Sequence, residues 1–153
     1  MSIEKVRDYL KEIGLEDRII EFNDSIATVK EAANKLKCDE KDIAKTLSFI
    51  VNDNPILIVV SGDSRINNSK YKKEFHIKAK MIPYDDVERL IGHKAGGVCP
   101  IAVNDNVKIY FDESLKKLDV LYPAAGSKNS AIKLTLCELE SILNDIKWID
   151  VCE

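Results

Sequence analysis

Two apolar segments separated by a short turn restrict the fold of this chain more than any other feature. The segments are residues 46–51 and 56–61, both rich in β-branched and aliphatic side chains, and Asn-Asp-Asn-Pro lies between them. β-Branched residues favour strands, whereas Asn, Asp and Pro favour turns. The pattern predicts a hairpin, and the nearly continuous apolar character of both strands predicts that both of its faces are covered.

Helical and strand patterns alternate irregularly on either side of this hairpin. Thr28 and Glu31 have the spacing of a capping box that opens an amphipathic helix. A short helical turn over residues 39–43 then leads to Lys45, which is placed between a helix and a strand. Other helices are predicted over residues 2–13, 67–74, 83–90 and 136–143, and other strands over residues 108–112, 120–123, 131–134 and 148–151.

This irregular alternation favours an α/β fold of the mixed α+β kind, with a mixed sheet flanked by helices instead of a purely parallel sheet. The length of 153 residues fits a single domain, predicted to span residues 1–153. A chain of this length buries roughly two thirds of its unfolded surface, so it needs no disulfide or metal for stability. The composition, 45% hydrophobic and 32% charged, is typical of a globular protein.

The overall charge argues against a dedicated DNA-binding protein. The formal net charge is −3, whereas a protein that binds duplexes is usually basic. One segment is nevertheless locally basic, and it is either a solvated surface or a strip that contacts RNA phosphates, which needs only a few cations. Its basic residues are Arg65, Lys70, Lys72, Lys73, Lys78 and Lys80.

The four cysteines form no Cys-x-x-Cys pair, and the two histidines and scattered carboxylates form no recognisable set of metal ligands. We therefore predict no metal and no cofactor. The first residues lack the apolar segment of a secretion signal, and no apolar run approaches ~18 residues, so no membrane span is predicted. These features predict a cytoplasmic protein with free thiols.

Residues 92–100 contain three glycines and a proline. Gly96 and Gly97 allow the backbone to come close to a ligand, and successive N–H groups there are able to stabilise a developing oxyanion. The segment is equally compatible with a long turn between a helix and a strand, and it lacks the spacing of a P-loop. It is therefore either a turn or part of a binding site.

Other positions are candidates for chemistry, each with a plainer structural alternative. Lys45 offers a fixed positive charge, or it is a surface lysine. Cys99 is a nucleophile with His93 or His76 as its base, or it is a small buried thiol. Nothing in the spacing shows these groups within hydrogen-bond reach or with a third orienting group, which favours the buried thiol. Gly126 and Ser127 form a second lip of a pocket, or they belong to a hairpin connection.

The order of these elements resembles that of the YbaK/prolyl-tRNA-editing family over residues 22–143. The elements are Ile43-Ala-Lys-Thr-Leu47, the strand pair, Gly62-Asp-Ser-Arg65, Gly92 with Gly96-Gly-Val-Cys-Pro100, Ile109-Tyr-Phe-Asp112, and Ala125-Gly-Ser127 before Ile132-Lys-Leu134. The resemblance implies a compact domain whose curved mixed sheet is flanked by helices. It also implies hydrolysis of the ester between a wrong amino acid and the 3′ end of tRNA, with mischarged tRNA and prolyl-tRNA synthetase as partners.

The resemblance further implies roles for individual residues. The catalytic residues are Lys45, Gly96, Gly97 and Val98, with the lysine orienting the tRNA end and the loop amides holding the oxyanion. The substrate-binding residues are Phe22, Thr46, Cys99, Pro100, Gly126 and Ser127, and the tRNA-binding residues are Arg65, Lys70, Lys72 and Lys73. The chain departs from the family at Cys99, where serine is usual, and in the polar residues 127–130.

The implied reaction is the removal of Cys or Ala from tRNA(Pro) by a trans-editing hydrolase. A synthetase pocket for proline discriminates against similar or smaller amino acids by only ~1–3 kcal/mol, so a second, hydrolytic site is useful. Two alternatives remain open. One is a non-catalytic module that binds a tRNA end or a protein, because fold does not determine function. The other is a hydrolase that uses Cys99 with His93.

Overall fold

The predicted hairpin forms the centre of the fold. In the computed structural model, which describes residues 2–143 and 145–153, β2 (Ile43–Val51) and β3 (Asn54–Ser61) pair antiparallel along their length. Asn52 and Asp53 join them with φ of 49° and 67°, the conformation of a two-residue type I′ turn. Pro55, predicted in the turn, lies in β3 instead. Pro55 lies opposite Ile50, whose N–H donates to the Lys80 carbonyl on the other side of β2. The missing N–H of Pro55 therefore costs the hairpin no hydrogen bond.

Further strands extend this hairpin into a curved mixed sheet, and two others form a separate antiparallel pair. They are β1 (Ile19–Glu21), β4 (Lys108–Asp112), β5 (Val120–Pro123), β6 (Ser130–Ile132), β7 (Leu134–Thr135) and β8 (Ile146–Ile149). The sheet has the order β7-β5-β2-β3-β4-β8, and β1 pairs with β6. Strands β5 and β2, β3 and β4, and β4 and β8 run parallel, whereas β7 is antiparallel to β5. The predicted fold class, a mixed sheet flanked by helices, is confirmed.

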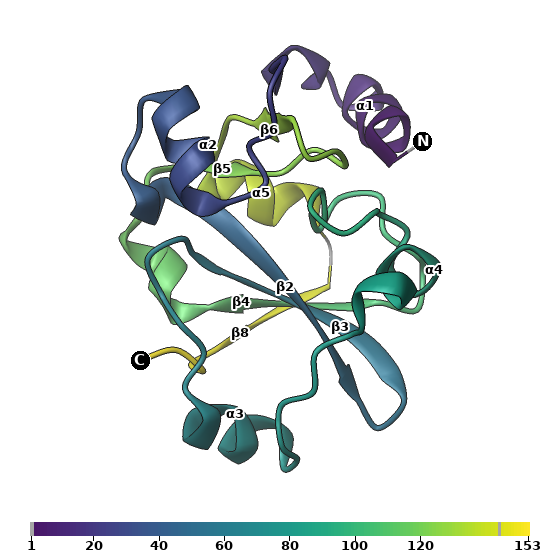
Figure 1. The fold of residues 1–153 in the computed structure, drawn as a ribbon, viewed down its shortest axis with the longest axis vertical. Coiled ribbons are helices and arrows are strands. Elements are labelled where there is room, and N and C mark those ends of the chain that lie inside the picture. The colour runs from purple at the N-terminus through teal and green to yellow at the C-terminus, as the bar shows by residue number, and fades with distance from the viewer. Residues whose placement is uncertain (1, 144) are drawn as a thin grey trace.

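The helices flank the sheet. They are α1 (Ser2–Glu12), α2 (Val29–Leu36), α3 (Asn68–Phe75), α4 (Val87–Ile91) and α5 (Leu136–Ile142), with short 3-10 turns η1 (Glu16–Arg18), η2 (Glu40–Asp42), η3 (Tyr84–Asp86) and η4 (Glu113–Lys117). Figure 1 shows α1 and α2 at one end and α3 at the other, with the sheet between them. The capping box predicted at Thr28 forms and opens α2.

Several predicted boundaries are wrong, and the reason is pairing between distant segments. The strand expected over residues 131–134 is two strands, because β6 pairs with β1 and β7 pairs with β5. The last strand begins at Ile146 instead of residue 148, since its partner β4 starts at the same level. Strand β2 begins at Ile43, so Lys45 lies within a strand and not before one.

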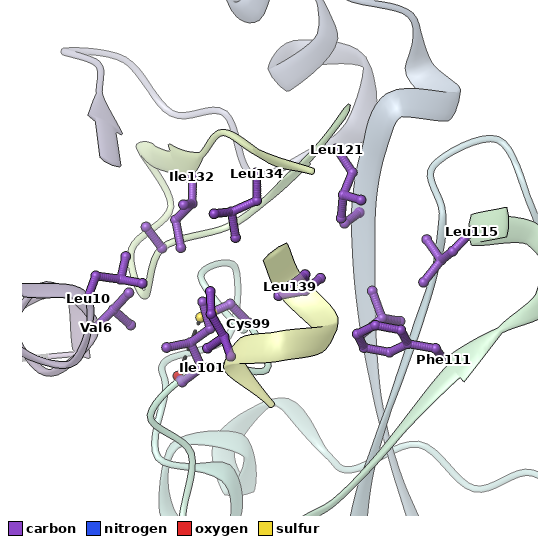
Figure 2. Packing of buried hydrophobic residues seen from close by; sticks show 14 of the residues in the cluster. Val6, Leu10, Cys99, Ile101, Phe111, Leu115, Leu121, Ile132, Leu134 and Leu139 are labelled. Carbon is purple, nitrogen blue, oxygen red and sulfur yellow. Dashed lines mark hydrogen bonds between the residues drawn. The ribbon is translucent and has the colours of Figure 1, made fainter. Parts of the chain in front are cut away.

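The largest cluster of buried residues joins the glycine-rich segment to the sheet and to α5. Figure 2 shows Cys99 and Ile101 close to Leu139 of α5, with Phe111 of β4 in the same cluster. All four side chains are fully buried. Burial of an aliphatic side chain such as that of Ile101 contributes about 1.5–3 kcal/mol. The segment is therefore anchored in the core directly after its glycines.

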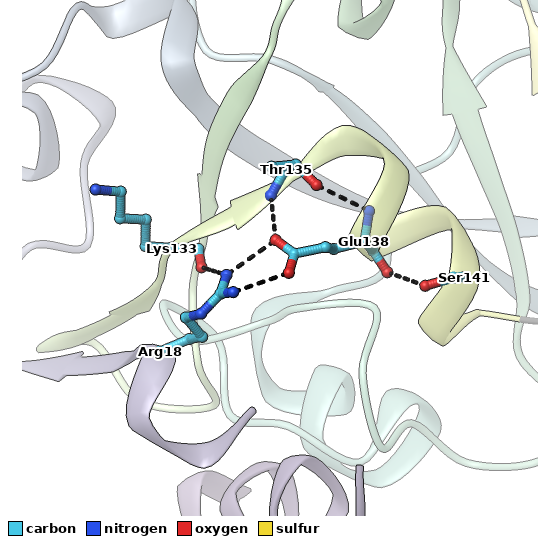
Figure 3. Close-up of polar contacts among 5 residues, drawn as sticks. All are labelled: Arg18, Lys133, Thr135, Glu138 and Ser141. Atoms are coloured by element: carbon cyan, nitrogen blue, oxygen red, sulfur yellow. Dashed lines mark hydrogen bonds and ion pairs between the residues drawn. The ribbon is translucent and has the colours of Figure 1, made fainter. Parts of the chain in front are cut away.

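An ion pair connects the first part of the chain to α5. Thr135 and Glu138 form the predicted capping box of this helix. The Glu138 carboxylate also accepts two hydrogen bonds of 2.9 Å from the Arg18 guanidinium (Figure 3). Arg18 contacts the Lys133 carbonyl as well, at 3.3 Å. This bidentate contact fixes the approach of η1, and therefore of β1, to the segment that carries β6.

Candidate functional site

A cavity of about 140 Å³ lies between the beginning of α2, the edge of β2, the glycine-rich segment and the loop before β6. It brings together parts of the chain that are far apart in sequence. Its lining residues are Ile26, Ala27, Thr28, Val29, Ala32, Ile43, Ala44, Lys45, Thr46, Gly96, Val98, Tyr122, Ala124, Ser127, Ser130 and Ala131. Of the predicted catalytic and substrate-binding residues, Lys45, Thr46, Gly96, Val98 and Ser127 thus meet in one place.

The edge of β2 is open where it borders this cavity. Strand β5 pairs with β2 only at Ile43 and Ala44, and the next edge contact is the Ser48 carbonyl, which accepts a bond from the Ile82 amide. Thr46 lies in the interval between them. Its Oγ1 is buried and has no hydrogen-bond partner among the residues described. Buried hydroxyls normally have a partner, so an unpartnered one in a residue that lines the cavity is unusual.

Lys45 is half-buried, and its ammonium is held in place. The Nζ donates a hydrogen bond of 2.7 Å to the Ser64 carbonyl, in the turn that follows β3. Burial lowers the pKa of the Lys45 ammonium, and the neighbouring Arg65 lowers it further, while Cys152 and Asp63 oppose the shift. The prediction that both faces of β2 are covered is wrong at this point, since Lys45, Thr46 and Leu47 are only half-buried.

The two glycines of the loop play different parts. Gly96 has φ of +92° and lines the cavity together with Val98. Gly97 does not line it, because its N–H donates to the Lys94 carbonyl at 3.1 Å and its carbonyl accepts from the Gly126 amide at 3.0 Å. A Cβ on Gly97 would lie 2.5 Å from the backbone nitrogen of Ser127. Gly97 therefore joins the two lips of the cavity, which are the glycine-rich segment and the loop before β6, by close packing. Its amide N–H already has a hydrogen-bond partner.

The second lip is held together by its own polar contacts. The Ser127 hydroxyl lies 2.5 Å from the Ser130 hydroxyl, and it donates a hydrogen bond of 2.9 Å to the Asn129 Oδ1. The Asn129 amide group donates to the Phe22 carbonyl at 2.7 Å. Phe22 does not line the cavity, and neither does Gly126. Phe22 packs against a cluster of buried residues, several of which line the cavity.

Cys99 and His93 face the core and not the cavity. Both are fully buried, and the Cys99 Sγ lies 3.7 Å from the His93 Nε2. The same Nε2 is 2.7 Å from the Ile101 carbonyl. Burial raises the pKa of the Cys99 thiol to about 12 and lowers the pKa of His93. At neutral pH the pair is a thiol and a neutral imidazole, which does not suit a nucleophile. Pro100 is buried beside them, outside the cavity.

We expect the Cys99→Ser variant to keep the activity of the parent protein and to lose about 1 kcal/mol of unfolding free energy, because serine can donate to the Ile101 carbonyl but fills less space. Iodoacetamide labelling between pH 5 and 8, followed by mass spectrometry, checks the state of the thiol. Cys99 should stay unlabelled in the folded protein while the exposed Cys137 reacts. An activity loss that accompanies alkylation of Cys99 would contradict this assignment.

The basic strip lies outside the cavity. Lys72 and Lys73 are exposed on α3, whereas the Lys70 ammonium is bound to Asp150 and to the Cys152 carbonyl, at 3.1 and 2.9 Å. Arg65 is exposed and belongs to the turn that holds Lys45. Of the predicted tRNA-binding residues, Arg65 is thus nearest the candidate site, and Lys70 is already paired.

Sequence reasoning missed one wall of the cavity. Residues 26–29 and Ala32, at the start of α2, line it, and so do Tyr122 and Ser130. The capping box located the helix start, but no pattern indicated that this start faces Lys45. The positive end of a helix dipole favours negative charge, as does the lysine. The lining residues include no Asp, Glu, His or Cys, so within the described part of the chain the cavity holds no carboxylate, imidazole or thiol that could act as a general base.

In residues 2–143 and 145–153, no group of three or more His, Cys, Asp or Glu side chains is placed to hold a metal ion. Over the same residues, no helix has both the length and the apolar character that crossing a membrane requires.

Comparison with known proteins connects this chain to a family. The model of the aminoacyl-tRNA editing domain matches residues 23–142. The Bacillus subtilis protein YwhH, described as uncharacterized, is 41% identical over 154 aligned residues, which cover 100% of this chain and 98% of YwhH. A proline–tRNA ligase of Lactiplantibacillus plantarum is 29% identical over 127 residues, which cover 82% of this chain and 22% of the ligase. The chain thus spans about a fifth of the length of that ligase.

A solved structure supports the same connection. It is that of a protein proposed to be a trans-editing enzyme for prolyl-tRNA synthetase, and it superimposes with a TM-score of 0.88. The two sequences are 26% identical, and the match covers 99% of this chain and 97% of that one.

Proposed function

Because the chain belongs to the aminoacyl-tRNA editing domain family, we propose that it is a trans-editing hydrolase that removes a wrong amino acid from tRNA. The observation that carries this proposal is the cavity at the open edge of β2. There the charge of Lys45, the unpartnered hydroxyl of Thr46 and the backbone of Gly96 and Val98 surround one space. The near full-length match to YwhH supports a single domain over residues 1–153 that acts apart from a synthetase.

The residues of the cavity divide the work between binding and charge stabilisation. Lys45, held at the Ser64 carbonyl, places a positive charge beside the 3′-terminal nucleotide and the reacting ester. The backbone of Gly96 and Val98 lies against the aminoacyl group, and amides there stabilise the oxyanion that forms when the ester carbonyl is attacked. The Thr46 hydroxyl binds a polar substrate atom, because it is otherwise buried without a partner.

The nucleophile in this proposal is water, or a group of the substrate itself. An aminoacyl ester is already reactive, so orientation and charge stabilisation supply the rate enhancement without a protein nucleophile. Two observations support a reaction without a protein nucleophile: Cys99 is buried and protonated, and the described lining residues include no acidic or histidine side chain. The reaction therefore depends on geometry, and residues that fix Lys45 and the glycine loop are as important as those in contact with substrate.

We further propose that the aminoacyl group is small, of the Cys or Ala type carried by tRNA(Pro). A volume of about 140 Å³ with walls of Ile26, Val29, Ile43 and Val98 leaves room for a short side chain. The similarity to a proline–tRNA ligase supports tRNA(Pro), and a partnership with prolyl-tRNA synthetase. On this proposal the protein acts in the cytoplasm, where charged tRNA is used, with Arg65, Lys72 and Lys73 contacting tRNA phosphates.

A panel of aminoacylated tRNAs tests the proposal. tRNA(Pro) charged separately with Cys, Ala, Ser and Pro is incubated with the protein, and the loss of the ester bond is followed over time. We expect rapid hydrolysis of Cys- or Ala-tRNA(Pro) and little hydrolysis of Pro-tRNA(Pro). Tight binding of these tRNAs without hydrolysis of any would indicate instead a non-catalytic module that binds the tRNA end.

A further inference from the structure

A buried carboxylate outside the cavity holds two separate parts of the backbone. Asp112 is the last residue of β4 and is 1% exposed. Its Oδ1 accepts a hydrogen bond from the Val151 amide and its Oδ2 accepts one from the Ser114 amide, both at 2.8 Å. Burial by itself would raise the pKa of Asp112, but these hydrogen bonds outweigh it and keep the pKa below its usual value. The carboxylate is therefore ionised at neutral pH, when such bonds are strongest.

The contact with Ser114 connects Asp112 to the start of the turn that holds Lys45. We call this turn, residues 62–67, the Ser64 turn. The Ser114 Oγ accepts a hydrogen bond of 3.1 Å from the amide of Ser61, the last residue of β3. The Ser61 carbonyl in turn accepts from the Ser64 amide at 2.9 Å. A Cβ on Gly62 would lie 2.1 Å from the Glu40 carbonyl, so the turn also packs tightly against η2.

The contact with Val151 leads to the other end of the same turn. The Val151 carbonyl accepts a hydrogen bond of 2.8 Å from the Asn67 amide, and Cys152 forms a β-bridge with Ile66. Figure 1 shows the last residues beside the segment that runs from β3 to α3. Successive hydrogen bonds therefore connect both ends of the Ser64 turn to the carboxylate of Asp112.

We propose that Asp112 is a positioning residue for Lys45. By holding both ends of the Ser64 turn, it places the Ser64 carbonyl that receives the Lys45 ammonium at 2.7 Å. Lysine is a flexible side chain with a compact charge, so its position depends on the partner that binds it. A shift of about 1 Å in a group that stabilises charge is enough to lower the rate about 100-fold. The catalytic consequence rests on the proposed function, whereas the consequence for the Lys45 amine does not.

The Asp112→Asn variant tests this inference, because it keeps the size of the side chain but replaces one acceptor oxygen by an NH2 group that cannot receive an amide N–H. We expect kcat to fall about 10-fold or more, with a nearly unchanged KM for charged tRNA. The matched control is Asp150→Asn, in the same segment as Val151. It removes only an exposed ion pair, so kcat should stay at the parent value.

A second measurement reports on Lys45 directly. Brief treatment of the folded protein with acetic anhydride, followed by mass spectrometry of peptides, gives the acylation of Lys45 relative to the exposed Lys35. We expect this ratio to rise several-fold in Asp112→Asn and to stay unchanged in Asp150→Asn. An unchanged ratio together with the parent kcat in Asp112→Asn would overturn the inference. A raised ratio in a protein that hydrolyses no aminoacyl-tRNA would leave it standing and overturn the proposed function instead.

A milder variant covers the case in which Asp112→Asn fails to fold. Ser114→Ala removes the Oγ, which receives the Ser61 amide and also interacts with the Asp112 carboxylate, and leaves the Ser114 amide on Asp112. We expect the same direction of change with a smaller size: a rise in Lys45 acylation and a fall in kcat. Parent values for both in a folded Ser114→Ala protein would contradict the first of the two routes from Asp112 to the Ser64 turn.

Discussion

The Lys45→Ala variant should hydrolyse its mischarged tRNA substrate 10²–10³ times more slowly than the parent protein, roughly the cost of removing one group that stabilises an oxyanion. The ammonium of Lys45 is the one positive side-chain charge among the residues that line the cavity, and it is held at the Ser64 carbonyl. The loss should appear mainly in kcat, since the charge acts on the reacting ester. Single-turnover hydrolysis of Cys- or Ala-tRNA(Pro) measures it.

The dependence of the rate on pH is a second test of the role of the Lys45 charge. The pKa of Lys45 lies below that of an ordinary lysine because of burial, so its positive charge is present below that lowered pKa and is lost above it. After subtraction of uncatalysed hydrolysis, the rate should fall as the pH rises through this pKa. This alkaline fall should be absent in Lys45→Ala.

The matched control for this variant is Lys35→Ala in α2, an exposed lysine whose ammonium pairs with Asp24. It should keep the parent rate and pH profile. Parent-like hydrolysis by Lys45→Ala would refute the role given to this lysine, even if the protein still binds tRNA.

The Gly97→Ala variant should lose about 100-fold in rate and about 2–3 kcal/mol in unfolding free energy. Its added Cβ would lie 2.5 Å from the Ser127 nitrogen and 2.7 Å from the Gly126 carbonyl carbon. Both neighbours are backbone atoms, which cannot rotate away as a side chain does. In the variant, the glycine-rich segment and the loop before β6 must separate, which strains the hydrogen bond between the Gly97 carbonyl and the Gly126 amide. Denaturant titration and the deacylation assay measure the two effects.

A glycine far from the cavity separates stability from activity. Gly14 follows α1 with φ of +76°, and no atom lies within 4 Å of its added Cβ. Gly14→Ala should therefore cost about 1 kcal/mol from its backbone conformation and leave the rate unchanged. If Gly97→Ala retained the parent rate, the close contact between the lips would not matter for the reaction.

Much of the architecture could be predicted because its signals are local. The hairpin of β2 and β3 depends on β-branched residues around turn-forming ones, and the capping boxes at Thr28 and Thr135 depend on residues three positions apart. The errors occurred where pairing with a distant strand decides the outcome. Residues 131–134 are apolar except for Lys133 and contain no turn-forming residue, yet β6 and β7 pair with different strands.

The candidate site was predicted in part for the same reason. Lys45 and the glycine-rich segment are distinctive residue types in a recognisable order, and four of the residues assigned around them, Thr46, Gly96, Val98 and Ser127, line one cavity with the lysine. Phe22, Gly97, Cys99, Pro100 and Gly126 do not line it. Whether a residue beside a motif points into a cavity or into the core depends on the element packed against it, which spacing along the chain does not specify.

The sequence by itself determined the hairpin, the starts of α2 and α5 and the residue types that surround the cavity, because each depends on neighbours along the chain. Only the tertiary structure decided which of these residues face one another. It placed Cys99 near Leu139 and outside the cavity, brought Gly97 against Gly126, and placed the Ser64 carbonyl on Lys45. These contacts join distant segments, and packing selects one partner from many that the same residue types would allow.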